Sequence, residues 1–290
     1  MRSVSNMSPL AALCYFMAVI GVVMFVRDLV IATVSLLFAV LFYVVGCGLK
    51  DIKSHVYTLI FFILIAVLNP FFYHNGATVL FVLGDNPITL EAIVYGVASA
   101  EMVVAVIYWF RSFTEIMTSD KLLSLFGAVS PKFSLMLSMI LRFVPLFSRQ
   151  SKDVKNAQRA LGMYKDDNIV DTVRVGARIF SGVSGWALEN GIITADSMAA
   201  RGYGAAKRTS FSLYRSKRSD VIFIIITAVM LAAVMFGAAF GTPFRFYPET
   251  FVPRDFFSLA MYATYALLCA ASSLLEIHEV AKWKYLTSKI

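Results

Sequence analysis

Charged residues are scarce in this sequence. Asp, Glu, Lys and Arg make up 15% of its 290 residues, whereas a soluble domain carries roughly 25%. Hydrophobic residues reach 59%, the mean hydropathy is +0.74, and apolar runs of about 20 residues, enough for a membrane-spanning helix, recur along the chain. The alternation typical of a transmembrane barrel is not visible. The sequence therefore predicts an all-α polytopic membrane protein.

The motifs of common catalytic and metal sites are also missing. There is no G-x-x-x-x-G-K-[ST] phosphate-binding loop, no H-E-x-x-H pair and no close His/Cys/Asp cluster. The three cysteines are too far apart in sequence to suggest a disulfide framework or a zinc site: Cys14, Cys47 and Cys269. The three histidines are expected at membrane edges, in contact with solvent: His55, His74 and His278. We therefore expect no metal, no bound ATP and no enzymatic activity in this chain.

Six membrane spans can be placed on the apolar runs. They cover residues 9–26, 29–49, 55–72, 88–110, 221–241 and 256–275. Only Arg27-Asp28 separates the first two, so either they form a tight hairpin or the first is partly interfacial. The connection at 73–87 carries no Lys or Arg, which places it outside the cell.

Basic residues gather in the centre of the chain. Residues 111–218 hold 17 basic and 8 acidic side chains, a net charge of +9, against +8 for the whole chain. Lys and Arg collect on the cytoplasmic side of membrane proteins, so we expect this block and both termini in the cytoplasm. The same rule explains the charge without a nucleic-acid partner. The expected divisions are N-terminal spans in 1–110, a cytoplasmic or interfacial region in 111–218, and C-terminal spans with a tail in 219–290.

Several helices are expected within the central block. Ser130-Pro131 is typical of a helix start, and it opens a mainly apolar run at 132–149. Residues 171–190 are amphipathic, with Val173, Ala177 and Phe180 on one stripe. This helix should end at Asn190-Gly191, and a short last helix should follow and end at Gly202 or Gly204.

Two carboxylates fall within the fourth span. Glu91 lies near its outer edge, where solvation or helix capping is expected. Glu101 lies near the middle of the membrane, where an unpaired charge is costly. We therefore expect Glu101 to make a polar contact with a neighbouring helix or subunit.

Short sequence elements occur in a consistent order between about residues 55 and 275. They are Asn-Pro-Phe-Phe at 69–72 with His74 and Gly76, Ile-Thr-Leu-Glu-Ala at 88–92, Asp-Lys at 120–121, Leu-Arg-Phe-Val-Pro at 141–145, and two Ala/Arg/Gly elements at 157–162 and 199–202. Together they resemble the transmembrane T component (EcfT, CbiQ-like) of energy-coupling factor transporters, which are bacterial and archaeal importers of vitamins and metal ions.

The resemblance implies a scaffold with two cytoplasmic coupling helices. Each coupling helix of the family ends in an Ala-Arg-Gly-like element whose arginine enters a groove on one of two ABC-type ATPases. Carried over to this chain, Ala200, Arg201 and Gly202 form the second element. A guanidinium suits such a contact because it is always charged and can bind a carboxylate with two hydrogen bonds.

The first element is less regular. Ala160 and Gly162 enclose a leucine, and the nearest arginine is Arg159, two positions before that leucine. Two helical residues are about 200° apart, so Arg159 cannot replace the missing side chain on a straight helix. Either the helix register differs locally, or the two docking sites are unequal.

The resemblance also implies the remaining partners. A substrate-binding membrane S component would lie on the coupling helices, with Met136, Met139 and Phe180 as candidate contacts. Methionine-rich surfaces repack easily, which suits a scaffold shared among partners. ATP and magnesium would be bound by the ATPases, and the assembly would reside in the bacterial cell membrane.

Two other functions fit the sequence. A stand-alone secondary carrier using Glu101 would transport substrate without ATPases. A membrane-anchored interaction protein would bind anionic lipid through the basic block, with an affinity that collapses in salt.

Overall fold

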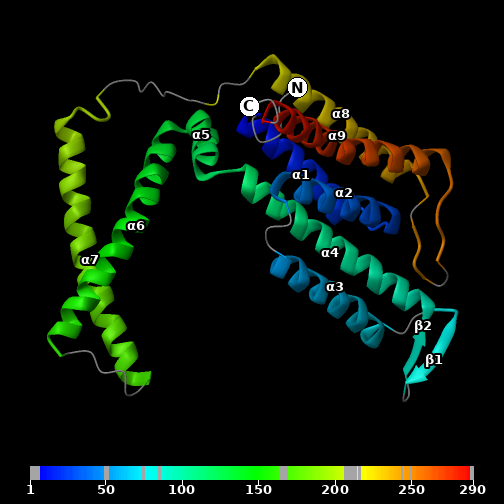
Figure 1. Cartoon of the computed structure of the whole chain (residues 1–290), viewed down its shortest axis with the longest axis horizontal. Helices are drawn as coiled ribbons and strands as arrows, with labels where there is room; N and C mark the ends of the chain where they lie inside the picture. The colour runs from blue at the N-terminus through cyan, green and yellow to red at the C-terminus, as the bar shows by residue number, and fades with distance from the viewer. Residues whose placement is uncertain are drawn as a thin grey trace. The chain divides into compact units, whose positions relative to one another are not determined.

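The computed structural model describes residues 7–48, 52–73, 76–83, 86–162, 169–205, 214, 217–242, 244–247 and 250–287. Its helices and strands are α1 (Pro9–Phe25), α2 (Leu29–Cys47), α3 (Ile52–Phe72), β1 (Val79–Leu83), β2 (Asn86–Thr89), α4 (Leu90–Ile116), α5 (Ser119–Val129), α6 (Pro131–Ala160), α7 (Ile169–Ala200), α8 (Arg218–Phe240) and α9 (Phe256–Thr287). The prediction of an all-α membrane protein is confirmed (Figure 1).

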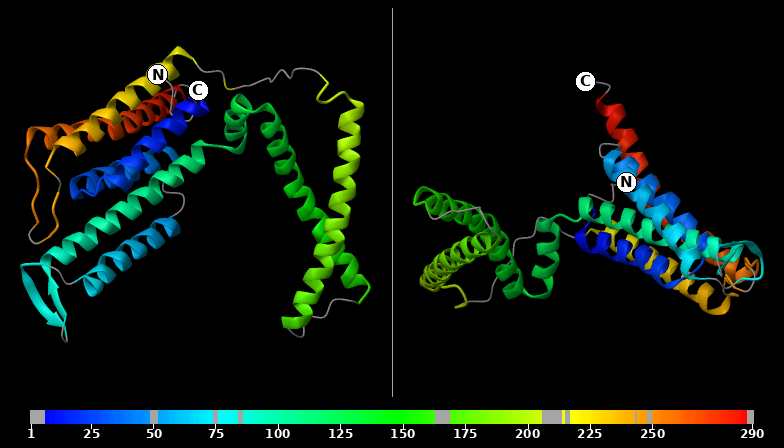
Figure 2. Two further views of the ribbon diagram at one scale, coloured as in Figure 1. Left: turned by 180° about the vertical axis from the view of Figure 1, so that it is seen from behind. Right: turned by 90° about the horizontal axis from the view of Figure 1, so that it is seen from below.

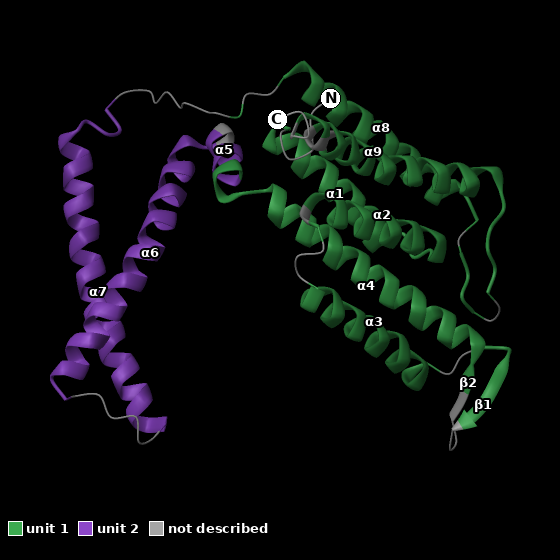
Figure 3. Ribbon diagram, in the orientation of Figure 1, with its two compact units in different colours: residues 1–121, 214–290 green, residues 122–213 purple. Residues whose placement is uncertain are grey.

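The chain forms two compact units, coloured separately in Figure 3. The first unit comprises Met1–Lys121 and Tyr214–Ile290, and the second comprises Leu122–Leu213. In the first unit α4 packs against both α2 and α3, while α9 packs against α2 and α8. The two views of Figure 2 show these helices as one bundle.

Among the described residues, six helices are long and apolar enough to cross a membrane: α2, α3, α4, α6, α8 and α9. This set differs from the expected one in two members. Helix α6 joins it because its 30 residues include a long apolar N-terminal part. Helix α1, expected as a span, is apolar but has only 17 residues.

The core of the first unit is aromatic, and two of its buried rings form hydrogen bonds to serine side chains. Trp109 of α4 is completely buried and donates a hydrogen bond from Nε1 to Ser35 Oγ at 2.9 Å. The hydroxyl oxygens of Tyr15 and Ser272 lie 2.6 Å apart. Since no water is available inside a bilayer, such pairs satisfy groups that would otherwise be costly to bury. They also fix how α1, α2, α4 and α9 pack together.

The structure confirms one expectation for the fourth span and corrects another. Thr33 Oγ1 of α2 donates to Glu101 Oε2 at 2.8 Å, which is the expected polar contact with a neighbouring helix. Glu91 was expected to be solvated or to cap its helix; it is buried in the first turn of α4 and accepts a hydrogen bond from Thr78 Oγ1 at 2.7 Å, so the solvated alternative is wrong. A Cβ on Gly76 would lie 2.5 Å from a Glu91 oxygen, so glycine permits this close approach.

The connection expected at 73–87 contains strands β1 and β2, which pair antiparallel. Thr89 at the end of β2 caps α4 by accepting a hydrogen bond from the backbone of Ala92. The hairpin and the start of α4 therefore form one continuous structure, in which Glu91 is fixed by Thr78. His74 and Asn75 lie outside the described residues.

Asp28 connects the first hairpin to the last helix. Its carboxylate caps α2 by accepting from the backbone of Val30 at 2.9 Å, and it accepts from the Tyr262 hydroxyl of α9 at 2.6 Å. Burial raises the pKa of Asp28, while the hydrogen bond from Tyr262 lowers it. The carboxylate is thus removed from water and stabilised by donors from two helices.

Replacing Asp28 with alanine should lower the free energy of unfolding by about 2 kcal/mol, because both the helix cap and the partner of Tyr262 are lost. Thermal unfolding of the purified chain in detergent measures this change. The matched control is Asp255→Ala, which removes an exposed carboxylate that also directly precedes a helix. Equal melting temperatures for the Asp28 variant and the unmodified chain would contradict this assignment.

Candidate functional site

The second unit is built on the antiparallel pair α6 and α7. Helix α6 begins as expected, with Ser130 Oγ accepting a hydrogen bond from the backbone of Phe133 and Pro131 in the first turn. The two helices cross (Figure 1), and at their contact the ring of Phe147 lies against Trp186 at 6.0 Å. The C-terminal ends of α6 and α7 consequently lie at opposite ends of the pair.

Helix α7 is longer than expected. It runs without a break from Ile169 to Ala200, so the predicted end at Asn190-Gly191 and the separate last helix are wrong. The polar side chains at this point bond back to their own helix: Asn190 Nδ2 donates to the Trp186 carbonyl at 3.1 Å, and Thr194 Oγ1 donates to the Asn190 carbonyl at 2.7 Å. These bonds let polar residues remain inside the helix.

The two helices end in the same backbone conformation. Each helix ends at an alanine. The backbone N–H of the next residue donates to the carbonyl four residues earlier: Leu161 to Ala157 and Arg201 to Ser197. The backbone N–H of the glycine after it donates to the carbonyl three residues earlier: Gly162 to Arg159 and Gly202 to Ala199. The two glycines have φ values of +69° and +74°. This left-handed conformation strongly favours glycine and is a common way to end a helix.

The shared backbone conformation shows which residues at the end of α6 correspond to residues at the end of α7. Counted from either the last helical alanine or the glycine, Leu161 occupies the position that Arg201 occupies on α7. The helix register therefore does not differ locally, and the two ends are unequal in side chain. Arg159 lies two residues earlier, still inside α6, and belongs to another face of the helix.

All six residues predicted to form the docking elements are exposed: Ala160, Arg159, Gly162, Ala200, Arg201 and Gly202. The structure does not gather them into one site. It divides them between the end of α6 and the end of α7, and 71% of the surface of Leu161 is exposed. The equivalence of Leu161 and Arg201 was missed at the level of sequence, although equal spacing to the two glycines is a signal for it.

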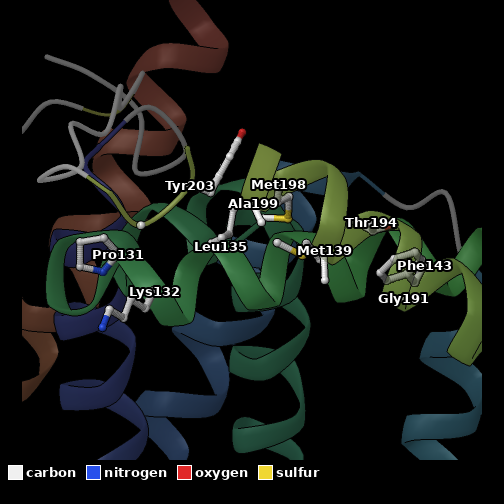
Figure 4. Close-up of a pocket in the computed structure, with 12 residues that line it drawn as sticks. Pro131, Lys132, Leu135, Met139, Phe143, Gly191, Thr194, Met198, Ala199 and Tyr203 are labelled. Carbon is white, nitrogen blue, oxygen red and sulfur yellow. The ribbon is translucent and has the colours of Figure 1, made fainter. Parts of the chain in front are cut away.

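A groove of about 750 Å³ lies between the start of α6 and the end of α7. Met139 of α6 and Met198 of α7 both line it, and Figure 4 shows them beside each other. Ala199 and Tyr203, which also line the groove, lie on either side of Arg201 in sequence. The second helix end is therefore adjacent to an apolar recess.

The candidate contacts for a membrane partner are in different environments. Met139 is partly covered in the groove, whereas Met136 and Phe180 are exposed at 59% and 74%. Val173 is likewise exposed, so the predicted stripe of α7 is uncovered at Val173 and Phe180. Val175 is the buried residue of this helix instead. Helix α7 thus carries apolar side chains on more than one face.

The Asp-Lys element lies at the end of the first unit. Lys121 is buried, and its Nζ donates to the Ile116 carbonyl at 2.9 Å, which satisfies an acceptor in the last turn of α4. Burial lowers the pKa of Lys121. We therefore assign this lysine a structural role at the end of α4.

The described residues contain no group of three or more His, Cys, Asp or Glu side chains that could hold a metal ion. Cys14 and Cys269 are both free thiols. His278 is exposed, as expected. His55 was expected to be solvated, but it is half-buried against Tyr108. His74 lies outside the described residues.

Comparison with known proteins identifies the family. The model of the CbiQ family, described as a cobalt transport protein, matches residues 1–211. The energy-coupling factor transporter transmembrane protein EcfT of Thermotoga maritima is 26% identical over 247 residues, which cover 82% of this chain and 90% of the relative. EcfT of Streptococcus equi is 28% identical over 180 residues, 58% of this chain and 67% of the relative.

A further relative, EcfT 1 of Listeria monocytogenes, is 26% identical over 202 residues, which cover 66% of this chain and 76% of the relative. These relatives are named as transmembrane proteins of transporters and not as enzymes. The residues that match the family model include the C-terminal ends of α6 and α7 and most of the candidate spans. This chain is a membrane protein of the CbiQ family, to which the T components of energy-coupling factor transporters belong.

Proposed function

We propose that this chain couples ATP hydrolysis by two partner ABC-type ATPases to movement of a substrate-binding S component during uptake of a vitamin, another micronutrient or a metal ion. The observation that carries the proposal is the pair of exposed helix ends on α6 and α7, which share one backbone conformation. Two helix ends that share one backbone conformation suit a partner that itself has two related halves.

Arg201 is the principal docking residue of the proposal. It follows the last residue of α7 directly, between Ala200 and Gly202, and neither neighbour has a bulky side chain. A partner surface can therefore approach the backbone closely. The guanidinium is suited to a carboxylate in a groove of the ATPase, where a bidentate ion pair would hold the helix end as the ATPases move.

The end of α6 offers a different surface. Its equivalent side chain is Leu161, which is apolar and exposed. We therefore propose that this end binds an apolar recess on the second ATPase, with Ala160 and Gly162 permitting close approach and Arg159 contacting the rim. Two unequal helix ends favour two ATPases that differ at their docking grooves.

The S component would lie against the apolar faces of the pair. Met136, Val173 and Phe180 leave a large part of their surfaces uncovered in this chain, and Met139 lines the neighbouring groove. Rotation of the ATPases on nucleotide binding would move the helix ends, and α6 and α7 would transmit that movement as a lever. ATP and magnesium would be bound in the ATPases, and substrate specificity would reside in the S component.

In this proposal the central block lies in the cytoplasm or at the membrane interface, where the apolar part of α6 contacts lipid or the S component, and both chain termini face the cytoplasm of a bacterial cell. The net positive charge of residues 111–218 supports that orientation. The hydrogen bond between Thr33 and Glu101 supports a packing role for Glu101, and the proposal therefore does not use this carboxylate for ion-driven transport.

Replacing Arg201 with alanine should reduce ATP-dependent uptake by the assembled transporter by at least about tenfold, because an ion pair at the docking groove is lost. Uptake into membrane vesicles measures this, with the amount of inserted chain determined in parallel. The control is Arg178→Ala, which removes another exposed arginine of α7. Full uptake by the Arg201 variant, or an equal loss in the control, would refute the docking role.

Replacing Leu161 with arginine tests the inequality of the two ends. A charge forced into an apolar recess is unfavourable, so we expect weaker retention of ATPase subunits when the chain is purified in mild detergent. Leu161→Met, which nearly conserves volume, should retain them. Stronger retention by the arginine variant would mean that both grooves accept a guanidinium and that the proposed apolar recess is absent.

A further inference from the structure

The ends of α2, α3 and α4 hold a cluster of aromatic and basic side chains that the coupling role does not use. The ring of His55 is stacked on that of Tyr108 at 5.7 Å, and His55 Nδ1 lies 2.8 Å from the Tyr108 hydroxyl. The ring of Tyr43 packs edge-on against both. The guanidinium of Arg111 lies over the Tyr108 ring at 5.5 Å.

Two polar atoms of this cluster are buried without a hydrogen-bond partner among the described residues: His55 Nε2 and Arg111 Nη1. An unpaired nitrogen on a guanidinium is rare in a folded protein, because leaving it unsatisfied is costly. A hydroxyl that donates to Nδ1 of a neutral imidazole leaves the proton on Nε2, where it can be donated in turn. Within the described part of the chain both atoms therefore lack an acceptor.

Two open hollows adjoin this cluster. The apolar one, of about 410 Å³, is lined by α2, α3 and α4 and includes Leu36, Val56, Leu59 and Phe62. The other, of about 460 Å³, includes Arg111 and Glu115 of α4 together with Tyr43. His55 and Tyr108 line the apolar hollow, so the cation–π contact between Tyr108 and Arg111 links the two.

The apolar hollow faces lipid. Only 11% of the spanning window of α3 is buried, and Val56 and Leu59 are exposed at 49% and 59%. The polar hollow lies at the start of α3 and towards the end of α4, where the spans leave the hydrocarbon. Such a combination suits an acyl chain in one hollow and a headgroup in the other.

The polar hollow contains opposite charges that do not pair. Arg111 and Glu115 are four residues apart on α4, yet the described part of the chain shows no ion pair between them. A simple anion would be attracted by Arg111 and repelled by Glu115. A headgroup that carries both a phosphate and a primary ammonium complements both side chains.

We propose that this cluster binds a membrane phospholipid with a phosphoethanolamine headgroup. The phosphate accepts hydrogen bonds from Arg111 and His55, the ammonium pairs with Glu115, and one acyl chain lies in the apolar hollow along α3. The lipid would join α3 to α4 at the membrane edge, independently of the docking ends on α6 and α7.

The test is native mass spectrometry of the purified full chain in detergent with three added lipids of identical acyl chains: phosphatidylethanolamine, phosphatidylglycerol and phosphatidylcholine. The unmodified chain should retain phosphatidylethanolamine about tenfold better than the other two. Soluble phosphoethanolamine, the headgroup alone, should not displace it at equal concentration. Equal retention of the three lipids, or displacement by the free headgroup, overturns the lipid site.

Two variants separate the proposed contacts. Arg111→Gln should weaken binding of all three lipids, because each carries a phosphate, whereas Glu115→Gln should weaken phosphatidylethanolamine and strengthen phosphatidylglycerol. The control is Lys53→Gln, which removes an exposed charge near His55 that lines neither hollow. An unchanged lipid preference in the Glu115 variant, or a loss in the control equal to that of Arg111→Gln, overturns the proposal. Because Glu115 is exposed, its variant remains informative if the Arg111 variant fails to fold.

Discussion

The antiparallel packing of α6 against α7 determines where the two exposed helix ends lie. Phe147 and Trp186 are in contact, and the C-termini of the two antiparallel helices consequently lie at opposite ends of the pair. Gly162 and Gly202 then end the helices in the same left-handed conformation. The side chains at positions 161 and 201 are thus presented by equivalent backbones, and at this position the two ends differ by leucine against arginine.

The membrane unit depends on polar pairs inside an apolar bundle. Trp109 with Ser35, Thr33 with Glu101, and Tyr262 with Asp28 each join side chains from different helices or loops. Hydrophobic burial does not fix helix positions within lipid, because lipid tails are as apolar as leucine. Hydrogen bonds between specific positions supply that information.

The sequence predicted those features of the fold that depend on residues close together in the chain. The apolar runs located five of the six candidate spans among the described residues, missing α6, and Ser130-Pro131 marked the start of α6. The prediction failed at Asn190-Gly191, because hydrogen bonds from Asn190 and Thr194 to preceding carbonyls keep α7 intact. It also missed the burial of Glu91, since the donor Thr78 comes from a separate segment. The equivalence of Leu161 and Arg201 was established by the backbone conformation of the two helix ends. Residue types alone do not specify that conformation.

The most direct measurement places a photoreactive amino acid at exposed position 197, one helical turn before Arg201, and purifies the tagged chain from bacterial membranes in mild detergent. If the guanidinium of Arg201 occupies a groove on an ATPase, irradiation gives a covalent adduct with an ATP-binding subunit, and two such subunits co-purify with the chain. A chain that is recovered alone, with adducts only to lipid or none at all, contradicts the account.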